Sequence, residues 1–206
     1  LVKPKVEGIL NIEVPAGNII VKYEKKGNKV LWVEIVNVDS YLAAKNLFVI
    51  SKDLGKINFD VSYGGNFYAI IDKQENYTDL NDYKAEQLIS YSREIREKIN
   101  KKYLDKFIHP FDSSIKDVSH ILWVGEVIDK ASSSRNAVFY GDKAIDRSPC
   151  GTGSSARMAQ LFSENKLGVG ETFIHESYIG SKFICRVEKS TKIKDFSGIT
   201  PVIRGW

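Results

Sequence analysis

A run of small residues around one of the two cysteines constrains this chain more than any other part of its sequence. Residues 146–159 read Asp-Arg-Ser-Pro-Cys-Gly-Thr-Gly-Ser-Ser-Ala-Arg-Met-Ala, and Ala156, Ala159 and Leu161 then recur at helical spacing. Cys150 is therefore expected at the N-terminus of a helix. The first helical turn has N–H groups without intrahelical partners and a partial positive charge, so it holds an anion and favours a thiolate.

The two glycines beside this cysteine favour an anion cradle. Gly151 and Gly153 have no side chain that would keep a ligand from the backbone, so we expect a carboxylate against the amides of Gly151, Thr152 and Gly153. A thiol in such a place can have its pKa lowered to about 3.5–7.5. The pattern therefore indicates a nucleophilic or acid/base thiol. The same residues also fit a buried structural cysteine before a tight turn.

A cysteine-dependent phosphatase is an alternative that the spacing disfavours. Those enzymes also combine a cysteine, a glycine-containing loop and an arginine at the start of a helix. Six residues, 151–156, separate Cys150 from Arg157, one more than in the phosphatase loop. The extra residue would turn the guanidinium group away from the cradle.

Charge and hydropathy argue against two classes of partner. The 30 Lys and Arg residues and 26 Asp and Glu residues are spread along the chain without a basic block of the kind that binds nucleic acid. No apolar run approaches the roughly 20 residues of a membrane span, and no signal peptide is recognisable.

Two cysteines without a disulfide-framework spacing favour a reducing, cytoplasmic setting. Cys185 lies in an alternating pattern and is expected in the core of a sheet.

Alternating apolar residues predict a chain made mostly of antiparallel strands. The expected strands are short runs within 9–38, then 46–50, 56–62, 119–124, 136–140, 170–179, 182–189 and 199–204. Helices are expected at 81–104, capped by Asp79 or Asn81, and at 151–165. Many strands with a few embedded helices indicate an α+β fold.

Residues 146–159 resemble the second active-site motif of the proline racemase and 4-hydroxyproline epimerase family. Residues 14–17, 63–69 and 175–181 resemble further family segments in the same order, so the resemblance covers essentially the whole chain. The family also has an earlier catalytic cysteine in a Cys-Gly-His motif, and no such motif precedes Val14. Because the chain also lacks an initiator Met, we expect it to be a fragment.

The resemblance implies a diaminopimelate-epimerase-like fold with two lobes, each mainly antiparallel sheet around a central helix. Residues 1–62 would be the remainder of the first lobe, 63–198 the second lobe with Cys150, and 199–206 a strand returning toward the first lobe. An incomplete first lobe would expose a sheet edge, which favours association with a second copy as a homodimer.

The implied chemistry is inversion at the α-carbon of a cyclic amino acid, without a cofactor or metal. One thiol removes the α-proton and a second thiol delivers a proton to the opposite face. Cys150 would be one of the pair. The amides of Gly151 and Thr152 would hold the substrate carboxylate, and Asp146 would face the ring nitrogen.

Three further residues bear on the substrate. His120 lies where 4-hydroxyproline epimerases of the family often carry histidine, so it is expected to bind the ring hydroxyl, although a histidine on a strand is more often an ordinary sheet residue. Tyr140 falls at a family position that faces the ring. Asn66 follows Gly64 and Gly65 at the rim of the expected cleft, where the glycines most simply indicate a bend.

These features favour a 4-hydroxyproline 2-epimerase and leave three alternatives. A proline racemase would perform the same reaction on an unhydroxylated ring. A trans-3-hydroxyproline dehydratase would have threonine at the first catalytic position, and its second motif often reads Cys-Gly-Ser-Gly instead of the Cys-Gly-Thr-Gly found here. The last alternative is a protein that only binds an amino-acid carboxylate.

Overall fold

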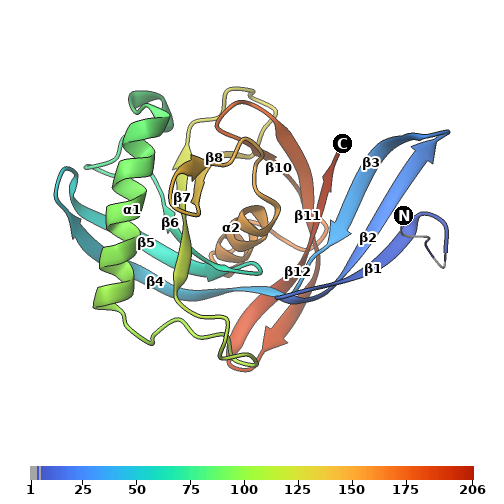
Figure 1. The fold of residues 1–206 in the computed structure, drawn as a ribbon, viewed down its shortest axis with the longest axis horizontal. Coiled ribbons are helices and arrows are strands. Elements are labelled where there is room, and N and C mark those ends of the chain that lie inside the picture. The colour runs from blue at the N-terminus through green and yellow to red at the C-terminus, as the bar shows by residue number, and fades with distance from the viewer. Residues whose placement is uncertain (1–3, 5) are drawn as a thin grey trace.

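The computed structural model describes residue 4 and residues 6–206. Its strands are β1 (Ile9–Val14), β2 (Gly17–Lys26), β3 (Lys29–Val36), β4 (Ser40–Ser51), β5 (Gly55–Tyr63), β6 (Phe67–Ile71), β7 (Val118–Gly125), β8 (Ser134–Tyr140), β9 (Ala144–Ile145), β10 (Thr172–Glu176), β11 (Lys182–Ile193) and β12 (Phe196–Gly205). Its helices are the 3-10 turn η1 (Leu80–Asp82), α1 (Ala85–Lys102) and α2 (Gly151–Ser163) (Figure 1). The expected α+β class is confirmed.

Eight strands close into a barrel. They run in the order β4, β5, β6, β7, β8, β10, β11, β12, and β12 pairs back with β4 through Gly198 with Tyr41 and Ile199 with Ser40. Two neighbouring pairs, β6 with β7 and β8 with β10, are parallel and the others are antiparallel. The β12 to β4 pairing joins the ends of the series.

Helix α2 lies within this barrel (Figure 1). Residues 153–160 are all buried, so every face of the helix is covered and not only one stripe. Its neighbours include β4, β5, β6, β11 and β12. The barrel therefore fixes the axis of the helix and, with it, the place where the helix begins.

Helix α1 packs on the outside of the barrel. Leu88, Ile95 and Ile99 are buried, and the helix neighbours β4, β7 and β8. The expected start at residue 81 is wrong, because residues 80–82 form the 3-10 turn η1 and α1 begins only after Lys84. Asp79 caps that turn and not α1. Within the described residues no helix is both long and apolar enough to span a bilayer.

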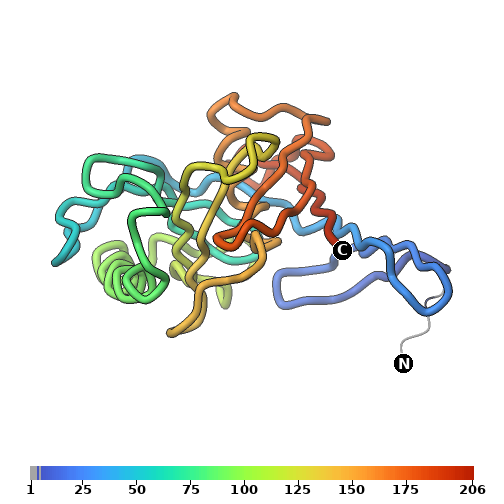
Figure 2. Tube along the Cα trace, turned by 90° about the horizontal axis from the view of Figure 1, so that it is seen from above, coloured from blue at the N-terminus to red at the C-terminus, as the bar shows by residue number. Residues whose placement is uncertain are grey.

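Strands β1, β2 and β3 form an antiparallel arm that projects from the barrel (Figure 2). β3 pairs with the last part of β12, where Val36 lies opposite Val202 and Val33 opposite Gly205. The outer edge of β1 has no further strand in the sheet order of the described residues. The change from arm to barrel falls between β3 and β4, earlier in the chain than residue 62.

Candidate active site

Cys150 is the N-cap residue of α2, as expected, and its backbone is strained. Its φ of 62° and ψ of 109° lie in a region that non-glycine residues rarely occupy. The preceding loop holds it there, because the Cys150 N–H donates to Ser148 Oγ at 3.0 Å and the Ser148 N–H donates to Asp146 Oδ1 at 2.8 Å. Asp146 thus supports the loop, in addition to any role toward a ligand.

A buried polar cluster supports the loop from behind. The Pro149 carbonyl oxygen accepts hydrogen bonds from Asn136 Nδ2 at 2.9 Å and from Ser154 Oγ at 3.3 Å. Ser154 Oγ also lies 2.8 Å from Nδ1 of His175. Burial, with a smaller contribution from Arg157, lowers the pKa of His175 to about 3, so this imidazole is neutral at ordinary pH.

The thiol of Cys150 faces Tyr68, which sequence reasoning missed. The Tyr68 hydroxyl lies 3.4 Å from Cys150 Sγ and 2.6 Å from Thr152 Oγ1. Thr152 Oγ1 is itself 3.8 Å from the sulfur. Gly153 leaves the space that the thiol fills, since a Cβ atom there would lie 3.2 Å from Sγ. Tyr68 lies in residues 63–69, which matched the family, but no local pattern indicates that its hydroxyl meets Cys150, which is 82 residues later in the chain.

The expected lowering of the Cys150 pKa is wrong for this structure. Burial raises the pKa of the thiol above its usual value, and the Asp146 carboxylate adds to the rise. Hydrogen bonds from Tyr68, from the Gly153 N–H and from Thr152 oppose the rise without cancelling it. The thiol form therefore predominates at neutral pH.

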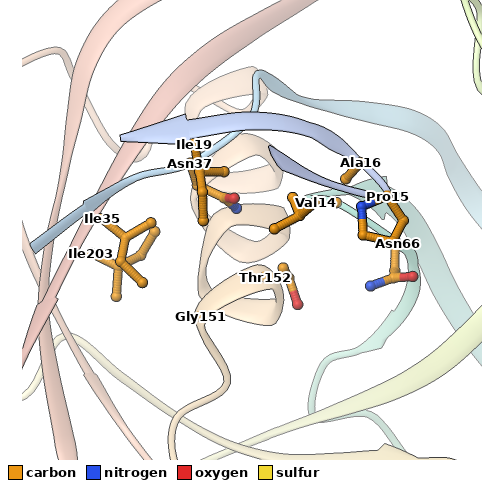
Figure 3. Close-up of a pocket in the computed structure, with 11 residues that line it drawn as sticks. Val14, Pro15, Ala16, Ile19, Ile35, Asn37, Asn66, Gly151, Thr152 and Ile203 are labelled. Carbon is orange, nitrogen blue, oxygen red and sulfur yellow. The ribbon is translucent and has the colours of Figure 1, made fainter. Parts of the chain in front are cut away.

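A cavity of about 320 Å³ lies between the first turn of α2 and the arm. Its lining is mostly apolar, and Figure 3 shows the helix start with Thr152 on one side of it and strands of the arm on the other. The lining residues are Val14, Pro15, Ala16, Ile19, Ile35, Asn37, Gly65, Asn66, Gly151, Thr152 and Ile203. Three of the expected site residues, Gly151, Thr152 and Asn66, therefore meet at one cavity.

Gly64 and Gly65 allow the helix to reach this position. A Cβ atom at Gly64 would lie 2.2 Å from the Thr152 carbonyl oxygen and 2.6 Å from the Ala156 nitrogen. Gly65 has a φ of 113° and lies against the Thr152 side chain. Residues 64–66 form the bend between β5 and β6 that the glycine pair indicated, and Asn66 lines the cavity.

His120 contacts the site through Tyr68. Their rings stack with centroids 4.7 Å apart, and His120 Nδ1 lies 2.6 Å from Ser119 Oγ. Burial, reinforced by the positive charge of Arg96, lowers the pKa of His120 to about 4. The ring is therefore neutral and able to donate or accept a hydrogen bond.

Tyr140 and Cys185 lie apart from this group. Tyr140 is the last residue of β8 and is 45% exposed, and among the described residues no hydrogen bond or ring contact joins it to Tyr68 or Cys150. Cys185 lies on β11, is 1% exposed and belongs to the core, as expected. Burial raises its pKa to about 12.

Known proteins match this chain over its whole length. The family model described as proline racemase matches residues 1–206. The chain is 54% identical over 206 residues to the 4-hydroxyproline 2-epimerase of Spirosoma linguale and 53% identical to the 4-hydroxyproline epimerase of Brucella ovis. The alignments cover all of this chain and 61% of the length of each relative.

A solved structure matches the fold over the whole chain. It is a hydroxyproline epimerase from Agrobacterium vitis with bound trans-4-hydroxy-L-proline, and it superposes with a TM-score of 0.90 at 26% identity. The match covers 100% of this chain and 59% of the other.

Proposed function

The chain belongs to the proline racemase family, and from this premise we propose that it is the part of a 4-hydroxyproline 2-epimerase that holds one acid/base thiol. The observation that supports this most is the position of Cys150, at the start of a buried helix whose next two residues, Gly151 and Thr152, line a mostly apolar cavity. The relatives named as 4-hydroxyproline epimerases support the choice of substrate. The substrate would be a cyclic amino acid.

The first turn of α2 would hold the substrate carboxylate. The N–H groups of the first four residues of a helix have no intrahelical acceptor, and Gly151 and Thr152 both line the cavity. A carboxylate held there draws electron density from the α-carbon, which stabilises the carbanionic transition state. Asp146, beside the same loop, would attract the charged ring nitrogen.

Cys150 would exchange a proton with one face of the α-carbon. Its thiol form would deliver a proton, and its thiolate would remove one in the opposite direction of the reaction. Inversion also needs an acid/base group on the opposite face. Among the described residues, those that line the cavity include no thiol, carboxylate or imidazole, and Cys150 directly precedes one of them, Gly151. We therefore assign the second group to residues outside this lining.

A two-lobed arrangement would bring that second group to the cavity. The closed barrel around α2 would be the lobe that carries Cys150, and the arm together with the end of β12 would belong to the other lobe. The division then falls between β3 and β4 and not at residue 62. Since no further strand of the described residues pairs with the outer edge of β1, this edge offers backbone pairing either to the rest of that lobe or to a second copy of the chain.

His120 would distinguish hydroxyproline from proline. A ring hydroxyl needs a partner within a mostly apolar cavity, and the neutral imidazole beside Tyr68 is able to provide one. Tyr140 does not line the cavity, so we assign the contact with the hydroxyl to His120 alone. A proline racemase is the second candidate, because Val14, Ile19 and Ile35 give the cavity an apolar wall that suits an unhydroxylated ring.

The decisive experiment replaces Cys150 in the complete gene product. Cys150→Ser is expected to lower inversion of 4-hydroxyproline by several orders of magnitude, while the core variant Cys185→Ala serves as the matched control and keeps activity. Near-normal exchange of the substrate α-proton in Cys150→Ser would contradict the assignment. Release of water from 3-hydroxyproline would indicate a dehydratase instead.

Substrate choice needs a separate measurement. Loss of a hydrogen bond to a substrate hydroxyl costs about 1–3 kcal/mol. His120→Ala is therefore expected to raise the activation free energy that corresponds to kcat/KM by that amount for 4-hydroxyproline, and by much less for proline. An unsubstituted enzyme that prefers proline would favour the racemase.

A further inference from the structure

The Tyr68 hydroxyl lies between two other hydrogen-bonding groups at the base of the site. Tyr68 belongs to β6 and is completely buried. Its oxygen is 3.4 Å from Cys150 Sγ and 2.6 Å from Thr152 Oγ1. A thiol, a phenol and an aliphatic hydroxyl each donate one hydrogen bond and accept others. The order of donors along this chain of three groups is therefore reversible.

We propose that Thr152, Tyr68 and Cys150 form a reversible hydrogen-bond chain in which Tyr68 is a positioning residue for the acid/base thiol. When sulfur is protonated, the Cys150 S–H donates to the Tyr68 oxygen, and the Tyr68 O–H donates to Thr152. When sulfur is a thiolate, the Thr152 O–H donates to Tyr68, and the Tyr68 O–H donates to sulfur. Both hydroxyls keep their own protons, and only the sulfur proton passes to or from the substrate.

The inference rests on the proposed role of Cys150, which alternates between these two states in every turnover. A fixed donor would stabilise only the thiolate, and a fixed acceptor only the thiol. A hydroxyl that reverses its direction bonds to both. The network therefore keeps the sulfur in one position in both states, and it stabilises the thiolate more than the thiol because a hydrogen bond to a charged group is the stronger one.

The surroundings leave these hydroxyls as the main side-chain donors to the sulfur. Cys150 and Tyr68 share an apolar cluster with Ile70, Leu122, Val124, Val138 and Ala156. Asp146 is the acidic group that acts on the thiol, and it raises the thiol pKa. His120, stacked on Tyr68, has a pKa of about 4 under the influence of burial and of Arg96, so it stays neutral while the thiol titrates.

Packing holds the Tyr68 ring in this position. One face stacks on His120, and the ring edge lies against Gly153, where a Cβ atom would be 3.3 Å from Cε1. Burial also raises the pKa of Tyr68 well above its usual value. The phenol therefore remains protonated when the thiol ionises, so that it donates to the thiolate and does not compete as an acid.

The test titrates the thiol of the 206-residue chain and needs no turnover. Cys185→Ala provides a background with a single thiol, whose ionisation is followed by ultraviolet absorbance and by the rate of alkylation with iodoacetamide. Loss of a hydrogen bond to a charged group shifts such an equilibrium by at least about tenfold. Tyr68→Phe is therefore expected to raise the thiol pKa and to slow alkylation near neutral pH about tenfold.

Tyr63→Phe is the matched control. Tyr63 is equally buried, but its hydroxyl has no partner among the described residues, so its removal should leave the thiol titration unchanged. Thr152→Val should raise the thiol pKa in the same direction as Tyr68→Phe, and Thr152→Ser should restore the original value. A merely structural role for Thr152 would not separate valine from serine in this way.

The outcomes separate this inference from the proposed function. An unchanged thiol pKa in folded Tyr68→Phe overturns the proposed hydrogen-bond chain. If that variant fails to fold, an unchanged thiol pKa in Thr152→Val overturns the proposal instead. Inversion that survives Cys150→Ser in the complete gene product would defeat the proposed function, whatever the titration shows.

Discussion

Gly64 and Thr152 touch through their backbones, because a Cβ atom at Gly64 would lie only 2.2 Å from the Thr152 carbonyl oxygen. The end of β5 and the first turn of α2 therefore pack without a side chain between them. Asn37 reinforces the contact, since its Nδ2 donates to the Gly64 carbonyl at 3.0 Å and to Ser155 Oγ at 2.9 Å. This contact fixes the position of the start of α2, and with it Cys150, within the barrel.

Gly64→Ala is expected to destabilise the fold. The contact is with backbone atoms, which cannot rotate away, so the helix must shift, at a cost of about 1–3 kcal/mol or more. Urea unfolding should show a lower free energy of unfolding. Gly151→Ala is the control, because a Cβ atom there meets nothing within 4 Å. Equal stability of the two variants would show that α2 is not seated on Gly64.

Alkylation should distinguish the two cysteines. Cys150 is 9% exposed beside the cavity, whereas Cys185 is 1% exposed and has its pKa raised to about 12 by burial. Iodoacetamide reacts with the thiolate, so Cys150 should be labelled first in the folded chain at mildly alkaline pH. Peptide mass spectrometry measures the order. Equal labelling under native conditions would mean that the buried environment around Cys185 opens.

Local patterns predicted most of the strands because alternation with a period of two is written into neighbouring residues. The closure of the barrel depends instead on the pairing of Ser40 and Tyr41 with Ile199 and Gly198, residues far apart in the chain. No local pattern reports such a register. The start of α1 was missed for a related reason, since the 3-10 turn after Asp79 shares the composition of a first helical turn.

The candidate site also combines features that local sequence patterns predict with features that depend on residues far apart in the chain. The place of Cys150 before α2 follows from the glycines and the helical spacing after them. The direction of its pKa does not, because burial depends on side chains that β6 and β7 bring to the thiol. Tyr68 and His175 owe their contacts to pairings between distant strands, so composition and spacing could place them on strands but could not join them to Cys150 or Ser154.

Stability should fall as the pH falls below about 6.5. Burial lowers the pKa of His120 to about 4 and that of His175 to about 3, whereas an unfolded histidine titrates near 6.5. Between these values the unfolded chain binds more protons. The stability that the two neutral histidines contribute is therefore fully present above pH 6.5 and falls toward pH 4 for His120 and pH 3 for His175, at up to about 1.4 kcal/mol per pH unit for each histidine.

Urea unfolding at several pH values tests this dependence. His120→Phe keeps an aromatic ring against Tyr68 but removes the titrating group, so its stability should vary less between pH 6.5 and pH 4 than that of the unsubstituted chain. An identical pH dependence in the two proteins would show that His120 is not held neutral by the fold.

The 206-residue chain by itself should not invert a free amino acid. Inversion by two acid/base groups needs one on each face of the α-carbon. Cys150 directly precedes Gly151 and Thr152, which line the cavity, while the arm contributes Val14, Ile19 and Ile35 to its wall. Cys185 is no substitute, because it is buried on β11. We therefore expect chiral chromatography to show no inversion of 4-hydroxyproline or proline by this chain in D₂O. Its binding of a free carboxylate should be weak at most. The Cys150→Ser chain gives the background rate. Inversion above that background by the purified chain, free of any longer form, would show that the second acid/base group lies within these 206 residues.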